Sequence, residues 1–197
     1  MADFILGSGS AGRRMILENA GLDFAIRRPD VDEEALKEQF LASGGNPEEL
    51  AMPLAEAKAV AVSRGEELPV LGADQVLVCD GRLFSKPRDM EQARENLKIL
   101  RGRPHRLISA LAVARGGEVV WRHVASAEMV MRDFSDEFLD WYLDKVGDKA
   151  LSSVGCYQVE GPGIQLFRQV EADWFTIIGL PLLPFLDWLR GEGIIAA

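Results

Sequence analysis

The sequence lacks the features of a membrane or secreted protein. Within its 197 residues, no apolar run approaches the roughly 18 residues that a membrane-spanning helix needs. The first residues contain no basic segment and no long apolar core, so we expect no signal peptide. Only two cysteines occur, Cys79 and Cys156, and their spacing does not fit a metal site. Reduced thiols are typical of a cytoplasmic protein, and we expect that location.

The chain also has no excess of basic residues. It carries 31 acidic and 22 basic side chains, for a formal net charge of −9. Proteins that bind DNA or RNA neutralise many phosphates with lysine and arginine. We therefore expect no nucleic-acid partner, although a few local cations could still hold one small phosphorylated ligand.

Several catalytic signatures are absent as well. The sequence has no Gly-x-x-x-x-Gly-Lys-Ser/Thr loop, no dinucleotide-binding glycine pattern and no zinc pattern. It has no Gly-x-Ser-x-Gly elbow. The two histidines, His105 and His123, have no obvious catalytic partners, and we expect both to be structural.

What is present indicates a globular α/β fold. Hydrophobic residues make up 48% of the chain and charged residues 27%, and the length suffices for one sizeable domain or two closely packed lobes. Apolar runs of strand length are interspersed with segments of helical period. We expect strands at residues 3–7, 24–27, 68–79, 82–85, 107–113, 118–131 and 164–170, and helices at 11–20, 34–42, 46–64, 89–100, 135–145 and from 181 to about 190.

The apolar run at residues 68–79 has an acidic residue, Asp74, at its centre. Such a run is typical of a strand that is buried on both faces. A carboxylate there is costly unless something pairs with it or ligates it. A structural ion pair, a metal ligand and a catalytic base are all compatible with this segment.

A second candidate site is the segment Ser8–Ser10, between the first expected strand and the first expected helix. Backbone N–H groups and hydroxyls at such a turn point to one place, and the helix dipole favours an anion there. Arg13 and Arg14 near the helix start oppose the dipole unless an anion is present. The segment predicts a phosphate site; the alternative is an ordinary strand-to-helix turn capped by serines.

Other charged residues could complete such a site. The acidic segment 29–34 either leads into a helix as a solvated loop or supplies one acid, Glu33, that joins Asp74 on a divalent metal. Lys58 lies near the apolar face of the expected helix 46–64, where it either points inward or snorkels. Lys86 precedes a proline that fixes the backbone beside it. Cations and a metal together could promote attack of water on a phosphoanhydride.

Taken in order, these motifs resemble those of the Maf family of nucleotide pyrophosphatases. No single block is specific, but seven blocks occur in the family's order and cover nearly the whole chain. The blocks are Ser8-Gly9-Ser10-Ala11-Gly12-Arg13-Arg14, Asp30-Val31-Asp32-Glu33, Leu54-Ala55-Glu56-Ala57-Lys58-Ala59, Gly72-Ala73-Asp74-Gln75, Lys86-Pro87, Gly155-Cys156-Tyr157-Gln158-Val159-Glu160-Gly161 and Gly179-Leu180-Pro181-Leu182.

The resemblance implies a two-lobed α/β fold, related to inosine triphosphatases, with an elongated central mixed β-sheet flanked by helices and a substrate cleft between the lobes. Residues 1–197 would form a single Maf-like domain whose lobes are not separable in sequence. The implied reaction is hydrolysis of a nucleoside triphosphate to the monophosphate and pyrophosphate, with Mg²⁺ or Mn²⁺. Members of the family have been tied to septum inhibition and to the removal of non-standard nucleotides.

The resemblance also implies roles for particular residues. Asp74 would accept a proton from the attacking water or hold the metal that activates it, and Glu33 would join the metal site. The residues that would hold the triphosphate are Ser8, Ser10, Arg13, Lys58 and Lys86.

Three positions, Gly12, Gln75 and Glu160, bear on the base that is recognised. The subgroup resembling dTTP and UTP hydrolases has Arg, Thr and Gln there, and the subgroup resembling 7-methyl-GTP hydrolases has Trp, Gln and Glu. This chain agrees with the second subgroup at Gln75 and Glu160 and departs from both at Gly12. A glutamate can accept hydrogen bonds from a guanine edge, whereas Gly12 offers no aromatic platform for the base.

The leading hypothesis is a metal-dependent nucleoside triphosphate pyrophosphatase, with 7-methyl-GTP or another modified nucleotide as the candidate substrate. One alternative is a nucleotide-binding regulator of cell division with little turnover, which the departures at Ala11, Gly12 and Ala57 favour. Another is a house-cleaning enzyme of the inosine-triphosphatase type. The expected partner is a nucleoside triphosphate, with no nucleic acid and no membrane; a homodimer is left open.

Overall fold

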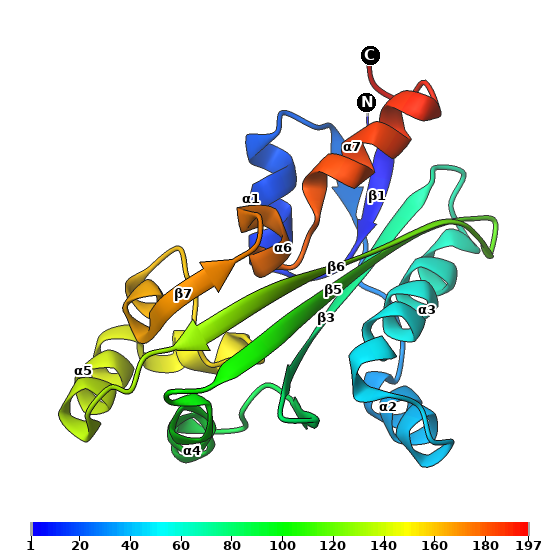
Figure 1. The fold of residues 1–197 in the computed structure, drawn as a ribbon. Coiled ribbons are helices and arrows are strands. Elements are labelled where there is room, and N and C mark those ends of the chain that lie inside the picture. Colours follow the sequence, from blue (N-terminus) through cyan, green and yellow to red (C-terminus); the bar gives the residue numbers. More distant parts are fainter. Residues whose placement is uncertain (1, 197) are drawn as a thin grey trace. The chain divides into compact units, whose positions relative to one another are not determined.

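The computed structural model describes residues 2–196 and has a mixed α/β architecture, as the sequence predicts. Seven strands form one mixed sheet, and helices flank it (Figure 1). Along the sheet the order is β2-β1-β3-β5-β6-β7, and β4 pairs with β3. The strands are β1 (Phe4–Gly7), β2 (Phe24–Ile26), β3 (Val70–Cys79), β4 (Arg82–Phe84), β5 (Pro104–Arg115), β6 (Glu118–Met131) and β7 (Phe167–Glu171).

The described residues form two compact units. The first unit comprises the residues up to Gln75, Ile108–Ala125 and those from Asp173 onward, and the second comprises Val76–Leu107 and Ser126–Ala172. The helices of the first unit are α1 (Ala11–Asn19), α2 (Glu33–Ala42), α3 (Ala51–Ser63), α6 (Trp174–Ile178) and α7 (Leu182–Gly191), with a 3₁₀ turn, η1, at Pro47–Glu49. The second unit contains α4 (Met90–Leu100), α5 (Asp136–Val146) and the 3₁₀ segments η2 (Gly147–Ser152) and η3 (Pro162–Leu166).

The core of the first unit is built on the parallel strands β1 and β3. Every residue of β1 is buried, and β3 is buried throughout except at the half-buried Gln75. Alternate residues of β3 face opposite layers, since successive side chains of a strand point to opposite sides. Leu71 and Ala73 join a core cluster with residues of α1 and α7, whereas Gly72 lies against α3.

Gly72 allows α3 to approach β3 closely. A Cβ atom added at Gly72 would lie 2.2 Å from the carbonyl oxygen of Ala55 and 2.6 Å from the backbone nitrogen of Ala59. Only glycine fits such an approach of two backbones. The contact fixes α3 over the strand, so that Lys58, between Ala55 and Ala59, is held close to Asp74.

In the second unit, the predicted hairpin at Asp80-Gly81 is confirmed. Both residues have positive φ, as a tight two-residue turn requires, and the turn pairs Leu77 with Phe84 in the antiparallel β3–β4 ladder. The strand expected at residues 164–170 begins later, because Pro162 starts the 3₁₀ segment η3 and β7 follows only from Phe167.

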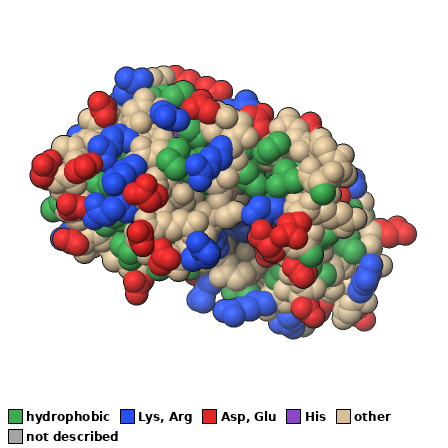
Figure 2. Space-filling view, turned by 90° about the horizontal axis from the view of Figure 1, so that it is seen from below, with side chains coloured by type: hydrophobic (Ala, Val, Ile, Leu, Met, Phe, Trp, Pro, Cys, Tyr) green, Lys and Arg blue, Asp and Glu red, His purple; other side chains and the backbone are tan. Residues whose placement is uncertain are grey.

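Two further features of the described residues are the distribution of charge on the surface and the length of the apolar helices. Acidic and basic side chains are interspersed over the face shown in Figure 2, rather than gathered into a patch of one sign. Within residues 2–196, no helix is long and apolar enough to cross a membrane.

Candidate active site

The loop between β1 and α1 brings three of the predicted site residues together. Ser10 caps α1, because its Oγ accepts the backbone N–H of Arg13 at 3.3 Å. The Oγ of the buried Ser8 accepts the N–H of Ser10 at 3.2 Å. The serines thus have the capping role of the alternative interpretation, but each hydroxyl still has its own hydrogen to donate. Those O–H groups and the start of α1 remain suited to an anion.

Arg13 connects this loop to two other segments. Its guanidinium donates through Nη1 to Ser8 Oγ (3.2 Å) and to the carbonyl oxygen of Ala73 (2.8 Å), and through Nε to the carbonyl oxygen of Gly179 (2.9 Å). These bonds use three of the five N–H groups of arginine and leave the two on Nη2. Burial lowers the pKa of Arg13, and the nearby carboxylate of Asp74 acts against that change.

Lys58 lies between two carboxylates. Its Nζ is 2.6 Å from Oδ1 of Asp74 and 2.8 Å from Oε2 of Glu33. Lys58 is 6% exposed and Asp74 is 8% exposed, so the pair is shielded from solvent. The inward-pointing interpretation of Lys58 is therefore correct, and the snorkelling alternative is wrong. Glu33, the half-exposed first residue of α2, is joined to Asp74 through the ammonium of Lys58, and a metal shared by the two acids stays a prediction.

The surroundings of Asp74 favour a carboxyl group that can take up a proton. Burial raises the pKa of Asp74 above the ordinary value of an aspartate, while the charges of Lys58 and Arg13 act against the rise. A carboxylate whose pKa is raised toward neutrality is a better general base. The geometry is compatible with a base and also with a structural ion pair.

The two acids fit the donor set of Mg²⁺ or Mn²⁺ only in part. Among residues 2–196 there is no group of three or more His, Cys, Asp or Glu side chains placed to hold a metal. Mg²⁺, however, is commonly bound by one or two carboxylates together with substrate phosphates. Lys58 contacts one oxygen of each carboxylate, so the other oxygen of Asp74 and of Glu33 can serve as a ligand. The residues therefore fit a metal that arrives with a phosphorylated substrate.

Gly12 and Gln75, two of the predicted specificity positions, lie against the short helix α6. A Cβ atom at Gly12 would lie only 2.9 Å from Cγ2 of Ile178, so a side chain at this position requires Ile178 to move. The amide nitrogen of Gln75 donates to the backbone carbonyls of Thr176 and Ile177, each at 3.1 Å. The sequence reasoning missed α6, although Asp173 as N-cap and Gly179 after the last turn could have indicated it.

Asp74 and Gln75 lie on the same stretch of strand edge. The pairing of β1 with β3 ends at Gly7 and Gly72, and the next β3 carbonyl, that of Ala73, accepts from Arg13 instead of from β1. Beyond Gly72 this edge of β3 is therefore not covered by β1. Asp74 faces α3 and Gln75 faces α6, because successive side chains of a strand point to opposite sides.

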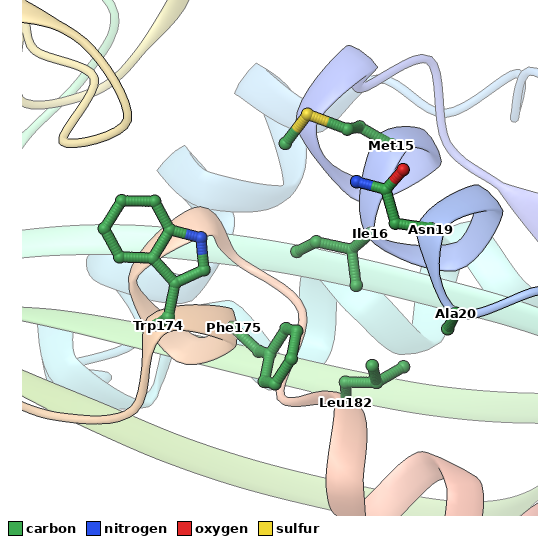
Figure 3. Close-up of a pocket in the computed structure, with 7 residues that line it drawn as sticks. All are labelled: Met15, Ile16, Asn19, Ala20, Trp174, Phe175 and Leu182. Atoms are coloured by element: carbon green, nitrogen blue, oxygen red, sulfur yellow. The ribbon is translucent and has the colours of Figure 1, made fainter.

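An apolar pocket of about 220 Å³ lies near α1, α6 and α7 (Figure 3). It is lined by Met15, Ile16, Asn19, Ala20, Trp174, Phe175 and Leu182. It contains no charged side chain and none of the predicted site residues. We therefore assign it no part in phosphate chemistry.

Two predicted site residues belong to the second unit. Lys86 is exposed after β4, and Glu160 is exposed in the segment between η2 and η3. Their expected contacts with the triphosphate and with the base stay predictions.

Buried side chains make hydrogen bonds in and around the glycine-rich segment that contains Glu160. The hydroxyl of Tyr142 donates to the carbonyl oxygen of Cys156 at 3.0 Å, and the Tyr157 hydroxyl lies 2.8 Å from Nε2 of His105. Burial lowers the pKa of His105 to about 4 and raises the pKa of Cys156 to about 11. Both side chains are therefore uncharged at neutral pH, and the thiol is a poor nucleophile.

The fold and site together define a mixed α/β protein in which a serine-rich strand-to-helix loop lies beside a buried lysine–carboxylate cluster. The sequence matches the family model described as "Maf-like protein" over residues 3–192, and the chain belongs to this family. It is 52% identical over 194 residues to a 7-methyl-GTP pyrophosphatase from Rhizobium meliloti, a match that covers 98% of each chain. It is 50% identical over 190 residues to a nucleoside triphosphate pyrophosphatase from Paramagnetospirillum magneticum, covering 96% of this chain and 98% of that one.

Proposed function

We propose that the protein is a nucleoside triphosphate pyrophosphatase, which hydrolyses the α–β phosphoanhydride to release the nucleoside monophosphate and pyrophosphate. The observation that carries the proposal is the buried cluster of Asp74, Lys58 and Glu33 beside the Ser8–Arg13 loop. The names of the relatives support the reaction. An anion-binding loop next to a carboxyl group of raised pKa is the arrangement that attack of water on a phosphate requires.

The loop would bind the polyphosphate. The hydroxyls of Ser8 and Ser10 and the two N–H groups on Nη2 of Arg13 are free to donate to phosphate oxygens. Lys58 would add a positive charge where negative charge develops. Lys86 would supply a further cation from the second unit.

Asp74 would act as the general base. Its carboxylate takes a proton from the attacking water as the water oxygen bonds to the α-phosphorus, and the bond to the leaving pyrophosphate breaks. Asp74 and Glu33 would hold Mg²⁺ or Mn²⁺, which when bound neutralises phosphate charge and lowers the pKa of a coordinated water. Lys58 then keeps the two carboxylates close together between turnovers.

For the substrate we propose 7-methyl-GTP or another modified nucleotide, and a house-cleaning role in the cytoplasm. The names of several relatives support 7-methyl-GTP. The acceptor groups of Gln75 and Glu160 suit the N–H donors of a guanine edge, and a carboxylate suits the positive charge of a methylated purine.

A substrate panel tests the reaction. Purified protein is incubated with Mg²⁺ or Mn²⁺ and with ordinary and methylated nucleoside triphosphates, and the products are separated by chromatography. We expect monophosphate and pyrophosphate; diphosphate and orthophosphate would contradict the proposal. Asp74→Asn should lower kcat by ~10²-fold or more. Asp187→Asn, which removes an exposed carboxylate of the same unit, is the control and should leave kcat unchanged.

The same panel separates the regulator hypothesis from the enzyme. Tight binding of a nucleotide by the wild type, with no product under either metal, would indicate a nucleotide-binding regulator. Preferential cleavage of inosine or xanthosine triphosphate would instead indicate a house-cleaning enzyme of the inosine-triphosphatase type.

A further inference from the structure

Arg28 is an exposed arginine that lies against the Ser8–Ser10 loop. A Cβ atom added at Gly9, in the middle of that loop, would lie 3.5 Å from Nε and 4.0 Å from Cγ of Arg28. The sheet brings the two together, because β2 pairs in parallel with β1 and the backbone N–H of Arg27 still donates to the carbonyl oxygen of Leu6 at 3.0 Å. Arg28 therefore leaves β2 beside the place where the loop leaves β1.

The guanidinium of Arg28 is not engaged by the protein in the described part of the chain, where no carboxylate and no carbonyl oxygen forms an ion pair or a hydrogen bond with it. Two nearby arginines differ in this respect. Arg27 pairs with Glu66 at 3.0 Å, and Arg14 at the start of α1 pairs with Glu18 at 2.6 Å. Arg28 can therefore offer its N–H donors to an anion at the loop.

The order of the strands indicates which part of a polyphosphate would meet Arg28. β1 lies between β2 and β3, and neighbouring strands are about 4.8 Å apart, so the backbones that carry Arg28 and Asp74 are about 10 Å apart. The Ser8–Ser10 loop follows β1 and lies between them. If water attacks the α-phosphorus beside Asp74, as proposed, a phosphate chain that crosses this loop brings its terminal phosphate to Arg28.

We propose that Arg28 binds the terminal phosphate of the substrate and selects triphosphates over diphosphates. A diphosphate with its α-phosphorus beside Asp74 has its last phosphate at the loop and does not extend to Arg28. Charge supports this role, because the positive charges of Lys58 and Arg13 already act on Asp74, and the protein carries a net charge of −9. The inference rests on the proposed function and adds a substrate-binding residue to it.

The test compares kcat/KM for 7-methyl-GTP, or for a triphosphate that the panel shows to be cleaved faster, with kcat/KM for the corresponding diphosphate. Hydrolysis of either substrate breaks the α–β bond, so the two differ only in the terminal phosphate. We expect Arg28→Gln to lower kcat/KM for the triphosphate by roughly tenfold, the effect of one hydrogen bond between charged groups, and to change that for the diphosphate by less than about twofold. If cleavage of the diphosphate is too slow to measure, its inhibition constant replaces kcat/KM.

Arg27→Gln is the matched control, because it removes the same charge from the adjacent residue, whose guanidinium already pairs with Glu66. It should change kcat/KM for either substrate by less than about twofold, since an exposed charge away from the ligand is screened by salt. Arg28→Lys keeps the charge and should restore part of the lost activity on the triphosphate. An equal loss for the triphosphate and the diphosphate, or no loss in Arg28→Gln, would overturn the inference.

Failure of the proposed function has a different result. If wild type cleaves no nucleotide, the binding of inorganic tripolyphosphate to wild type and to both glutamine variants is measured by calorimetry. Weaker binding by Arg28→Gln than by Arg27→Gln would support the phosphate-binding role of Arg28 without the reaction. Equal binding by the two variants, or no binding by wild type, would refute it.

Discussion

Replacement of Lys58 by methionine removes the ammonium that lies 2.6 Å from Asp74 and 2.8 Å from Glu33. Removal of one partner of a buried ion pair costs about 3–5 kcal/mol, because the other charge stays buried and unpaired. Arg13 still lies near Asp74, and the side chain of Glu33 is 53% exposed and can be hydrated. We therefore expect the free energy of unfolding at pH 7 to fall by about 3 kcal/mol, at the lower end of that range.

The loss should depend on pH. Without Lys58, the pKa of the buried Asp74 rises further, so the folded variant binds a proton that the unfolded chain has released. A group whose pKa is raised in the folded state stabilises the fold at low pH, and this contribution disappears as the pH rises through the folded pKa. Relative to wild type, Lys58→Met should therefore regain part of its stability between pH 7 and pH 5.

Urea unfolding, followed by tryptophan fluorescence at both pH values, measures these changes. Lys98→Met is the matched control, because Lys98 pairs with Glu95 at 3.2 Å but is 40% exposed. We expect it to change the free energy of unfolding by less than about 0.5 kcal/mol. A loss below about 1 kcal/mol in Lys58→Met, or the same loss at both pH values, would refute the view that the pair is buried and coupled.

Three further predictions follow from the same contacts. Because burial raises the pKa of Asp74, the acidic limb of the kcat/KM profile should lie above the ordinary pKa of an aspartate, and Asp74→Glu should displace that limb. Gly72→Ala should destabilise the fold by about 3 kcal/mol in urea melts, because its Cβ would meet the Ala55 carbonyl, whereas Gly65→Ala, with open space around it, should be neutral or slightly stabilising. The pKa of His105 is lowered from 6.5 to about 4 in the folded protein, so the unfolded chain takes up this proton first as the pH falls. The free energy of unfolding should therefore fall by about 3 kcal/mol between pH 6.5 and pH 4, and His105→Gln should remove that part of the pH dependence.

The parts of the site that could be predicted from sequence are those with a local signal. An acid inside an apolar run is visible because burial of a charge demands a partner, and the pairing of Asp74 with Lys58 meets that demand. The Ser8–Ser10 turn is visible because strand, small polar residues and helix follow one another directly. For the same reason, a local turn signal predicted the Asp80-Gly81 hairpin.

The parts that could not be predicted depend on contacts between residues far apart in the chain. Gln75 and Thr176 are 101 residues apart, and α6, at five residues, is too short to give a helical period. The expected helix 46–64 is divided into η1 and α3, and this division could have been predicted from a proline in the sequence. Pro53 lacks an N–H and is tolerated only in the first turn of a helix, so α3 begins at Ala51.

The charges around the buried pair Asp74–Lys58 bear on whether a metal is needed when a triphosphate binds. Asp74, Glu33, Lys58 and Arg13 carry two negative and two positive charges, so the site is neutral without substrate. A triphosphate brings several negative charges into a protein whose net charge is already −9. Lys58 cannot neutralise the phosphates and both carboxylates at once, because its ammonium has three donors and two already face the acids. If Asp74 and Glu33 hold a divalent ion when the triphosphate binds, as proposed, the ion would supply the positive charge that the carboxylates need, and Lys58 would be free to donate to phosphate oxygens.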